Sequence, residues 1–384
     1  MSAEDRLPMP PGARTPPARF YIDPGLYRDE VERVFCRGWF HAGRADQIPR
    51  QGNYVLREIV GESLILVRDG AGEDGSGGDI HALFNVCRHR GTRLCTAAEG
   101  TYPGTIQCPY HAWTFDLTGR LVGAPHMEGI PGFRKEDYPL RRARVSLWEG
   151  HIFLNLADEP EPLDARLGAA RDRFRPWGMA DLRLGARIVY DVAANWKLIV
   201  QNYSECLHCP IIHPALQRLS HYLKSVSDTP TPACLGGWMG LREGVETLSR
   251  DGKRRRAYLP GLGADERRRV YYYAVLPNLL LSLHPDYVMT HTLWPRACDR
   301  TLVVCEWHFH PDAMAQPGFD ASDAVEFWDM TNRQDWHVCE LSQLGIASRA
   351  YTPGPYSDRE DLLAEFDRMI LQLGAGPAET PDRP

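Results

Sequence analysis

Residues 202 to 214, NYSECLHCPIIHP, hold two cysteines, two histidines and a glutamate within a short stretch. Two neutral imidazoles and one carboxylate on one face of an ion, with open positions opposite, are typical of non-haem Fe(II) that binds dioxygen. A continuous helix would rotate His208 and His213 by about 140° from each other. Because Pro210 cannot continue a helix, we expect the chain to turn there and bring His213 back toward His208.

The two cysteines of this stretch suggest a different chemistry, a C-x-x-C redox pair or half of a zinc site. A thioredoxin-like pair opens a helix after a strand, whereas Cys206 and Cys209 close a predicted helix and enclose His208. A zinc site needs a second half, and none is free once the ligands below are assigned. We therefore expect Cys206 and Cys209 to be packing residues. Four further cysteines are expected to be buried reduced thiols: Cys36, Cys234, Cys298 and Cys305.

The third ligand of an iron site must come from elsewhere in the chain. The segment ASDAVEFWDMTNRQDWHVCELSQLG, residues 321–345, has the spacing and the end signals of a long helix. Asp335 shares a largely apolar face of this helix with Trp328 and Cys339, where a carboxylate is costly unless it is paired or bound to metal. Asp335 is the predicted carboxylate ligand, and a hydrogen-bonded or exposed aspartate is the alternative. Three further acids of the helix are weaker candidates: Glu326, Asp329 and Glu340.

A second set of ligands lies earlier in the chain, in CRH at 87–89 and CPYH at 108–111. Two thiolates and two imidazoles at the tips of two hairpins can hold one metal or a binuclear cluster. Zinc is the alternative, but ligands two apart on a strand leave little room for a tetrahedral turn. Mixed pairing suits a [2Fe–2S] cluster, with Cys87 and Cys108 on one iron and His89 and His111 on the other.

The elements that must position these residues fall into two groups. Residues 52–157 read as short strands separated by turns, which predicts an all-β domain. After an acidic, Pro-rich link, apparent strands at 269–310 and the long helix predict an antiparallel sheet with a helix across it. The predicted fold is therefore α+β. We expect an N-terminal arm and helix over 1–39, with its first 19 residues loosely ordered, a β domain over 40–157 and a metal-binding domain over 158–384.

Composition narrows the possible partners. The chain of 384 residues carries a mild net charge of -6 and no Lys/Arg-rich block, so neither nucleic acid nor an anionic membrane surface is an expected partner. It has no signal-peptide pattern and no apolar run of membrane-spanning length, which predicts a cytoplasmic protein. A glycine fingerprint for nicotinamide or flavin is absent from the sequence.

The segments CRHRGTRLC and CPYHAWTFD resemble the Rieske motifs of the ring-hydroxylating-type Rieske oxygenases, large α subunits. The resemblance covers nearly the whole chain and implies a Rieske [2Fe–2S] domain followed by a helix-grip catalytic domain with mononuclear Fe(II). That iron uses His, His and Asp, and TNRQDWHVCELSQLG is similar to the segment that supplies the aspartate. Rieske proteins of respiratory complexes carry an extra disulfide beside the cluster. Here Tyr110 stands at one of those positions and Cys95 has no evident partner, which favours the oxygenases.

The resemblance implies a terminal oxygenase. Electrons from a separate NAD(P)H-dependent reductase, of flavin or ferredoxin type, pass through the cluster to the mononuclear iron, which activates O2 and hydroxylates a small molecule. It also implies a homotrimer in which electrons cross between subunits. An acid at the position of Glu205, usually Asp, joins the neighbour's Rieske histidine to an iron-ligand histidine. Asn202 and the triplet 195–197 match the family pattern as well.

The substrate is the least determined part of the prediction. A glutamate at position 205 resembles the branch that oxidises choline, carnitine and glycine betaine. This resemblance favours oxidative N-demethylation or hydroxylation of a quaternary ammonium substrate held by aromatic faces. An aromatic acid clamped by Arg242 is the alternative, and mono- versus dioxygenation stays open. An electron carrier with a non-catalytic ligand-binding domain is a remote alternative. The candidate cage residues are Trp238, Tyr271, Tyr272, Tyr273, Tyr287 and Trp294.

Overall fold

The computed structural model describes residues 6–70 and 78–374, in two compact units. The first is a β unit, Cys36–Pro160. The second is an α+β unit, made of the described parts of Met1–Phe35 and Glu161–Pro384. The first helices of the chain therefore belong with the α+β unit rather than forming a separate N-terminal segment.

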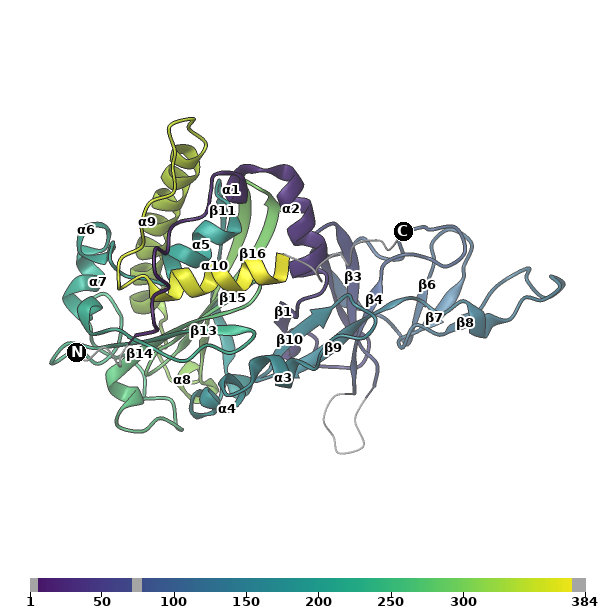
Figure 1. The fold of residues 1–384 in the computed structure, drawn as a ribbon. Helices are drawn as coiled ribbons and strands as arrows, with labels where there is room; N and C mark the ends of the chain where they lie inside the picture. Colours follow the sequence, from purple (N-terminus) through teal and green to yellow (C-terminus); the bar gives the residue numbers. More distant parts are fainter. Residues whose placement is uncertain (1–5, 71–77, 375–384) are drawn as a thin grey trace. The chain divides into compact units, whose positions relative to one another are not determined.

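The β unit contains a seven-stranded sheet and a separate three-stranded sheet (Figure 1). The order in the larger sheet is β1-β10-β9-β4-β3-β2-β5, and that in the smaller one is β6-β7-β8. All pairs are antiparallel, so short hairpins join many of the neighbours. The strands are β1 Phe40–Arg44, β2 Asn53–Ile59, β3 Glu62–Arg68, β4 Ile80–Phe84, β5 Glu99–Thr101, β6 Thr105–Gln107, β7 Thr114–Asp116, β8 Leu121–Gly123, β9 Arg142–Trp148 and β10 His151–Asn155.

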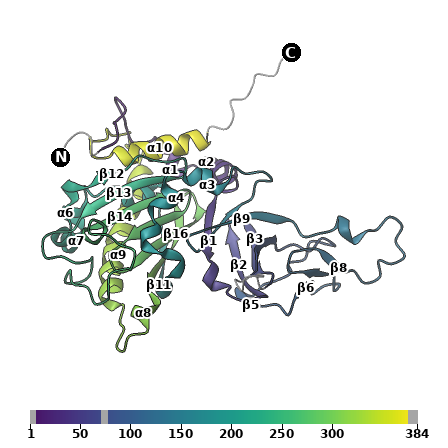
Figure 2. The ribbon, with the colours of Figure 1, turned by 90° about the horizontal axis from the view of Figure 1, so that it is seen from below.

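The α+β unit is built on a second seven-stranded antiparallel sheet, in the order β11-β17-β16-β15-β14-β13-β12. Figures 1 and 2 show its strands side by side, with the helices α5, α9 and α10 in the same unit. Strand β15 is buried along its whole length, as expected for the middle of a covered sheet. The strands are β11 Arg183–Val192, β12 Val226–Ser227, β13 Cys234–Gly240, β14 Arg269–Val275, β15 Leu279–Leu283, β16 Val288–Ala297 and β17 Arg300–Phe309.

Ten α-helices occur among the described residues, and the longest is α9, which confirms the helix predicted at 321–345. Its buried side chains include Ala324, Phe327, Trp328 and Thr331, the spacing of a helix face turned toward a core. The helices are α1 Arg19–Ile22, α2 Pro24–Glu30, α3 Leu163–Leu167, α4 Ala170–Arg173, α5 Trp196–Tyr203, α6 Cys209–Ile212, α7 Pro214–Leu219, α8 Pro311–Met314, α9 Ser322–Ile346 and α10 Asp361–Gly374. Short 3-10 or π segments are η2 Val31–Phe35, η3 Ala45–Gln47, η4 Lys135–Asp137, η5 Arg175–Trp177, η6 Met179–Asp181, η7 Tyr222–Lys224 and η8 Glu266–Arg268.

The described part of the N-terminal arm is fastened to the α+β unit. Arg6 donates to Asp361 Oδ1 at 3.1 Å and to Ser225 Oγ at 2.7 Å, and the Thr15 amide donates to the Gly354 carbonyl. The expectation of a loosely ordered arm is therefore wrong for residues 6–18. Its prolines leave few backbone donors for a sheet or helix, but side-chain and turn contacts hold the segment in place.

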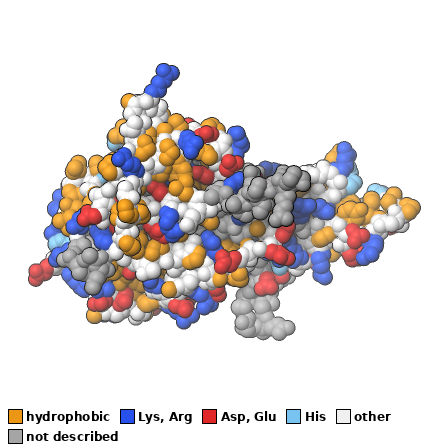
Figure 3. Space-filling model, viewed as in Figure 1, with side chains coloured by type: hydrophobic (Ala, Val, Ile, Leu, Met, Phe, Trp, Pro, Cys, Tyr) orange, Lys and Arg blue, Asp and Glu red, His pale blue; other side chains and the backbone are white. Residues whose placement is uncertain are grey.

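The surface gives no sign of a single-sign charge field on the face drawn in Figure 3. Over the α+β unit, cationic and anionic side chains are interspersed with hydrophobic ones. Among the described residues, no helix is both long and apolar enough to cross a membrane.

A buried ion pair joins the first helices to α5. Lys197 is 1% exposed and Glu30 is 6% exposed, and the Lys197 ammonium donates to a Glu30 oxygen. The Trp196 indole donates to the other Glu30 oxygen at 3.0 Å. Burial lowers the pKa of Lys197, and the Glu30 carboxylate opposes that shift. Helix α5 is thus anchored to α2 through a buried charge, to whose neutralisation the Asp367 carboxylate of α10 also contributes.

Removing the carboxylate should therefore destabilise the α+β unit. Breaking a buried pair by taking away one partner leaves an uncompensated charge, and the expected loss for Glu30→Gln is about 3–5 kcal/mol of unfolding free energy. Urea unfolding followed by tryptophan fluorescence measures it. The exposed Glu32 supplies the control, because Glu32→Gln should change the midpoint little. Equal midpoints for the two variants would contradict the role given to Glu30.

Candidate active site and metal centres

The two histidines flank the short helix α6, with His208 before its first residue and His213 after its last. Helix α5 ends at Tyr203, where the Ser204 hydroxyl donates back to the Val200 carbonyl, and α6 begins at Cys209. The prediction that Pro210 ends the helix between His208 and His213 is wrong. Pro210 lies in the first turn of α6, where a missing N–H costs nothing because that donor has no partner within the helix.

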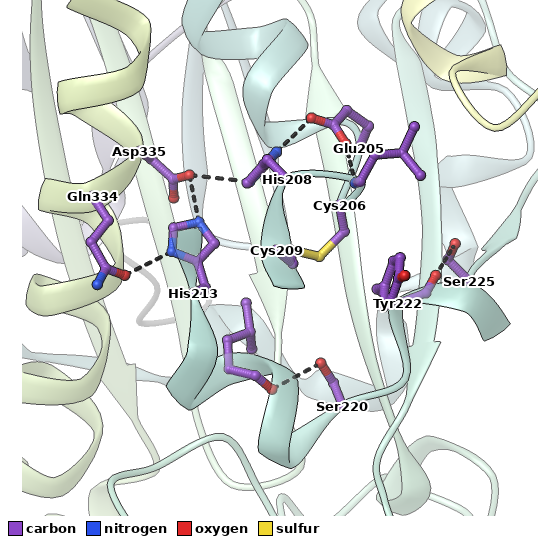
Figure 4. Close-up of a disulfide and its surroundings, with 12 residues drawn as sticks. Glu205, Cys206, His208, Cys209, His213, Ser220, Tyr222, Ser225, Gln334 and Asp335 are labelled. Atoms are coloured by element: carbon purple, nitrogen blue, oxygen red, sulfur yellow. Dashed lines mark hydrogen bonds and ion pairs between the residues drawn. A yellow bond between two sulfur atoms is a disulfide. The ribbon is translucent and has the colours of Figure 1, made fainter. Parts of the chain in front are cut away.

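His208, His213 and Asp335 nevertheless meet (Figure 4). His213 Nε2 lies 2.8 Å from Asp335 Oδ1, and His208 Nε2 lies 3.3 Å from the same oxygen. The two imidazole rings are steeply inclined, at 79°, with centroids 5.1 Å apart. One ligand atom from each residue lies within 4.8 Å of the other two, and this is the one such group of metal-ligating side chains found in the described part of the chain. The structure thus brings together all three predicted ligands of the mononuclear site.

The outer nitrogen of each imidazole is also occupied. His208 Nδ1 lies 2.5 Å from Glu205 Oε1, and His213 Nδ1 lies 2.8 Å from Gln334 Oε1. An acceptor on Nδ1 places the ring proton there and leaves Nε2 free to ligate, the usual support of a metal-bound histidine. Glu205 reaches His208 from a turn rather than from the predicted helix. The sequence analysis did not predict that Gln334 contacts His213. This contact depends on how α9 packs in the tertiary fold, which sequence spacing does not show.

Two carboxylates determine the electrostatics of this centre. Burial raises the pKa of Asp335, but hydrogen bonds from His208 and His213 outweigh it, so the pKa lies below its ordinary value. Burial lowers the pKa of His208, but the hydrogen bonds to Asp335 and Glu205 raise it to about 10. Both shifts indicate a site that favours positive charge at the position shared by the three side chains, which is where a cation would lie.

The other acids of helix α9 are engaged elsewhere. Asp329 accepts a hydrogen bond from the Tyr190 hydroxyl, Glu326 pairs with Arg250 at the surface, and Glu340 accepts from the Ala193 amide. Asp335 is therefore the acid of this helix that approaches the two histidines.

Cys206 and Cys209 form a disulfide, with their Cα atoms 5.0 Å apart. The expectation that they are unpaired packing residues is wrong in this structure. Because α5 ends before Cys206, the intervening turn lets the two sulfurs approach. The bond joins this turn to Cys209, the first residue of α6, close to Glu205 and His208 (Figure 4). The four cysteines predicted to be thiols form no disulfide with any described residue. Cys234 and Cys305 are buried, and the other two are half-buried: Cys36 and Cys298.

A cavity opens beside the three metal-ligating side chains. Its volume of about 100 Å³ is several times what one water needs. Asn202 is among the lining residues. Of the six predicted cage residues, Tyr272 and Trp238 line the cavity. Strand alternation turns Tyr271 and Tyr273 to the opposite face of β14.

Four aromatic residues that the sequence did not point to also line the cavity: Tyr203, Tyr222, Trp328 and Trp336. Each lies in a helix or a short 3-10 segment, whereas the predicted cage residues were chosen from expected strands. The guessed clamp Arg242 is not part of the lining, and its Nε donates to the Gln217 and Ser220 carbonyls.

In the β unit, the two predicted thiol ligands lie together. Cys87 and Cys108 are both buried, and each begins a turn closed by backbone hydrogen bonds, from Gly91 to Cys87 and from Ala112 to Cys108. Burial is the main reason that the pKa of Cys87 is raised, and the neighbouring Cys108 thiol adds to it. Two buried thiols in contact are stabilised as thiolates by a metal.

The two predicted imidazole ligands form the matching pair. The His89 and His111 rings have centroids 4.7 Å apart, and Trp113 stacks on His89 at 8°. His89 is exposed and His111 is half-buried, whereas the thiols are buried. A separate thiol pair and imidazole pair fit a binuclear cluster with one iron for each pair. Cys95 is a free thiol that donates to the Ala97 carbonyl, so no disulfide accompanies this site among the described residues.

The fold and the two sites define a class. The β unit carries a thiol pair and an imidazole pair, and the α+β unit carries a His2Asp centre beside a cavity. Together they are the two halves of a Rieske-type non-haem iron oxygenase.

Comparison with known protein families identifies the family. Residues 179–375 match the family described as ring hydroxylating alpha subunit (catalytic domain), and residues 38–134 match the Rieske [2Fe-2S] domain. The chain belongs to the family of Rieske oxygenase α subunits.

The relatives include enzymes of the quaternary ammonium branch. The chain is 31% identical, over 93% of its length and 90% of the relative's, to the glycine betaine monooxygenase oxygenase subunit of Pseudomonas aeruginosa. It is 38% identical over 53% of its length, and 54% of the relative's, to the carnitine monooxygenase oxygenase subunit of Escherichia coli. A solved structure of the quaternary ammonium Rieske monooxygenase CntA aligns with a TM-score of 0.80 at 25% identity, over 96% of this chain and 99% of that one.

These findings confirm the predicted fold class and the enzyme class. The two domains imply a Rieske [2Fe–2S] cluster and a mononuclear iron. The residues present fit both groups in composition, because two imidazoles and a carboxylate meet in the α+β unit, and a thiol pair and an imidazole pair occur in the β unit.

The disulfide is open to direct measurement. Two of the ten cysteines form the disulfide. The denatured protein should therefore show about eight reactive thiols without reductant and about ten after reduction. Thiol titration under anaerobic denaturing conditions, with the cluster released, measures the number. The double variant Cys206→Ser/Cys209→Ser should give about eight in both states. Ten thiols in the untreated wild-type protein would rule out the bond.

Proposed function

We propose that this chain is the terminal oxygenase of a multicomponent monooxygenase that hydroxylates a quaternary ammonium compound. His208, His213 and Asp335 hold the mononuclear iron, and Cys87, His89, Cys108 and His111 hold the cluster. The carrying observation is a metal-ligating triad that opens onto an aromatic-lined cavity. When bound, the cluster relays electrons from a separate NAD(P)H-dependent reductase and the iron activates O2.

The cavity walls support a cationic substrate. The Tyr203 and Tyr272 rings are 5.9 Å apart at 76°, and the Tyr272 and Trp328 rings are 6.4 Å apart at 68°. Ring faces set at steep angles can surround a methylated ammonium, which is attracted to each face within about 6 Å. The names of the relatives, which act on betaine and carnitine, favour the same substrate class.

Glu205 is proposed to carry electrons into the site. Its Oε1 contacts His208 Nδ1 and its Oε2 accepts from the Leu207 amide, so the carboxylate is fixed on the outer side of an iron-ligand histidine. The exposed His89 of a neighbouring subunit is the proposed partner on the other side, within a homotrimer. His89 is exposed and His111 is half-buried, so the imidazole pair is accessible to another subunit.

Single turnover separates the substrate classes without knowing the reductase. The chemically reduced, iron-loaded protein is mixed with O2 and choline, glycine betaine, carnitine or benzoate, and products are measured by mass spectrometry. We expect product from at least one ammonium compound and none from benzoate. His208→Ala is the matched control: it should lose product and fall from about three irons per chain to about two while the cluster's visible spectrum remains. Product from benzoate alone would refute the substrate assignment, and about two irons in the wild type would favour an electron carrier.

Substitution of Glu205 tests the electron path. In the same experiment, reoxidation of the cluster by O2 and substrate should slow by about 10- to 100-fold in Glu205→Gln, because the amide oxygen can accept from His208 but lacks the negative charge of the carboxylate. Glu205→Asp should slow it less. The iron content and the spectrum of the oxidised cluster serve as controls and should not change. Reoxidation at the wild-type rate in Glu205→Gln would remove Glu205 from the path.

A further inference from the structure

Three polar side-chain atoms at the cavity have no hydrogen-bond partner among the described residues. They are His291 Nδ1, Trp336 Nε1 and Tyr272 Oη, and each atom is buried. His291 is 2% exposed and Trp336 is 7% exposed. Most buried polar atoms in folded proteins are paired, and an unpaired one is costly. A cluster of three at a cavity beside a metal centre therefore indicates a polar group of the ligand.

The hydrogen-bond character of His291 follows from its other nitrogen. His291 Nε2 lies 3.2 Å from Asn332 Oδ1, which only accepts, so Nε2 carries the ring proton. The orientation of the Asn332 amide is supported by its Nδ2, which donates toward the Tyr190 hydroxyl and the Cys305 sulfur. The ring is neutral, because burial lowers the pKa of His291 to about 4. Nδ1 therefore carries a lone pair that finds no donor among the described residues, in a side chain that lines the cavity.

Trp336 supplies the opposite character. Its indole N–H is a donor and never an acceptor. The centroids of the His291 and Trp336 rings are 5.8 Å apart and the rings are inclined at 87°, so neighbouring rings carry an acceptor and a donor. The Tyr272 hydroxyl can serve as either. A hydroxyl group donates and accepts at once. A carboxylate only accepts, and a methyl or methylene group does neither.

The position of this pair relative to the aromatic walls matches a small amino alcohol. The Tyr203 ring lies 6.2 Å from the His291 ring and 5.9 Å from the Tyr272 ring. A cation held against the Tyr203 ring therefore lies near the neighbouring His291 ring, and both residues line the cavity. In choline and carnitine, the hydroxyl-bearing carbon is separated from the ammonium nitrogen by a single methylene group.

We propose that His291 Nδ1 and Trp336 Nε1 bind a hydroxyl group of the substrate, so that the site selects hydroxylated quaternary ammonium compounds over their deoxy analogues. The inference rests on the proposed function and names the substrate class within it. A deoxy analogue leaves both buried groups unpaired, which weakens its binding by about tenfold or more.

Binding to the iron-loaded protein without O2 tests this directly. Isothermal titration calorimetry compares two matched pairs that differ by one hydroxyl, choline with ethyltrimethylammonium and carnitine with γ-butyrobetaine. In at least one pair, the hydroxylated member should bind about tenfold or more tightly. His291→Phe, which keeps a ring and removes the acceptor, should reduce that ratio to about one, and Trp336→Phe should reduce it by removing the donor.

His284 supplies the matched control, since it is also fully buried with both ring nitrogens unpartnered but does not line the cavity. His284→Phe should keep the wild-type ratio. The cluster spectrum and circular dichroism verify that each variant is folded, and the wild-type ratio needs no variant at all. Equal binding within both pairs, or an unchanged ratio in His291→Phe, overturns the hydroxyl inference alone. Failure of every ammonium compound to bind overturns the proposed function instead.

Discussion

One carboxylate oxygen between two imidazoles is the interaction on which the catalytic unit depends. Asp335 Oδ1 contacts both His208 and His213, and without these partners a carboxylate on this face of α9 would be costly to bury. The two histidines flank the short helix α6, more than one hundred residues earlier in the chain. The site therefore exists only while α5 and α9 are held together, and its geometry reports on the packing of that helix pair.

Several contacts hold α5 against α9 along their length. The Asn195 amide donates to Gln343 Oε1 at 2.9 Å, and the Cys339 thiol lies 3.7 Å from the Leu198 carbonyl. At the start of α5, Asn195 caps the helix, and Glu30 neutralises the charge of the buried Lys197. Beyond its end, Glu205 fixes the orientation of His208. Both stability and function therefore depend on α5. The buried Lys197–Glu30 pair lies at its N-terminal end, and Glu205 and His208 follow its C-terminal end.

The parts of this arrangement that depend on local spacing could be predicted from the sequence. The C-x-H and C-x-x-H motifs place their ligands at hairpin tips, and the periodicity of 321–345 places Asp335 on the buried side of a helix. The parts that depend on tertiary contacts could not. The sequence predicted a helix up to Pro210, so the turn that brings Cys206 to Cys209 was not expected. No pattern in the sequence marks Gln334 as the partner of His213. The aromatic residues of the cavity wall were predicted only in part for the same reason. Tyr203 and Trp328 line the cavity from helices, whereas the prediction considered the strands.

The central claim is that Asp335 completes an iron site with His208 and His213. Anomalous diffraction from crystals of the iron-loaded protein, collected on both sides of the iron absorption edge, tests it most directly. We expect one iron peak within ligand distance of His208 Nε2, His213 Nε2 and an Asp335 oxygen, apart from the paired peaks at Cys87, Cys108, His89 and His111. A peak bound by the two histidines with Asp335 turned away, or no peak between them in iron-replete protein, would contradict the account.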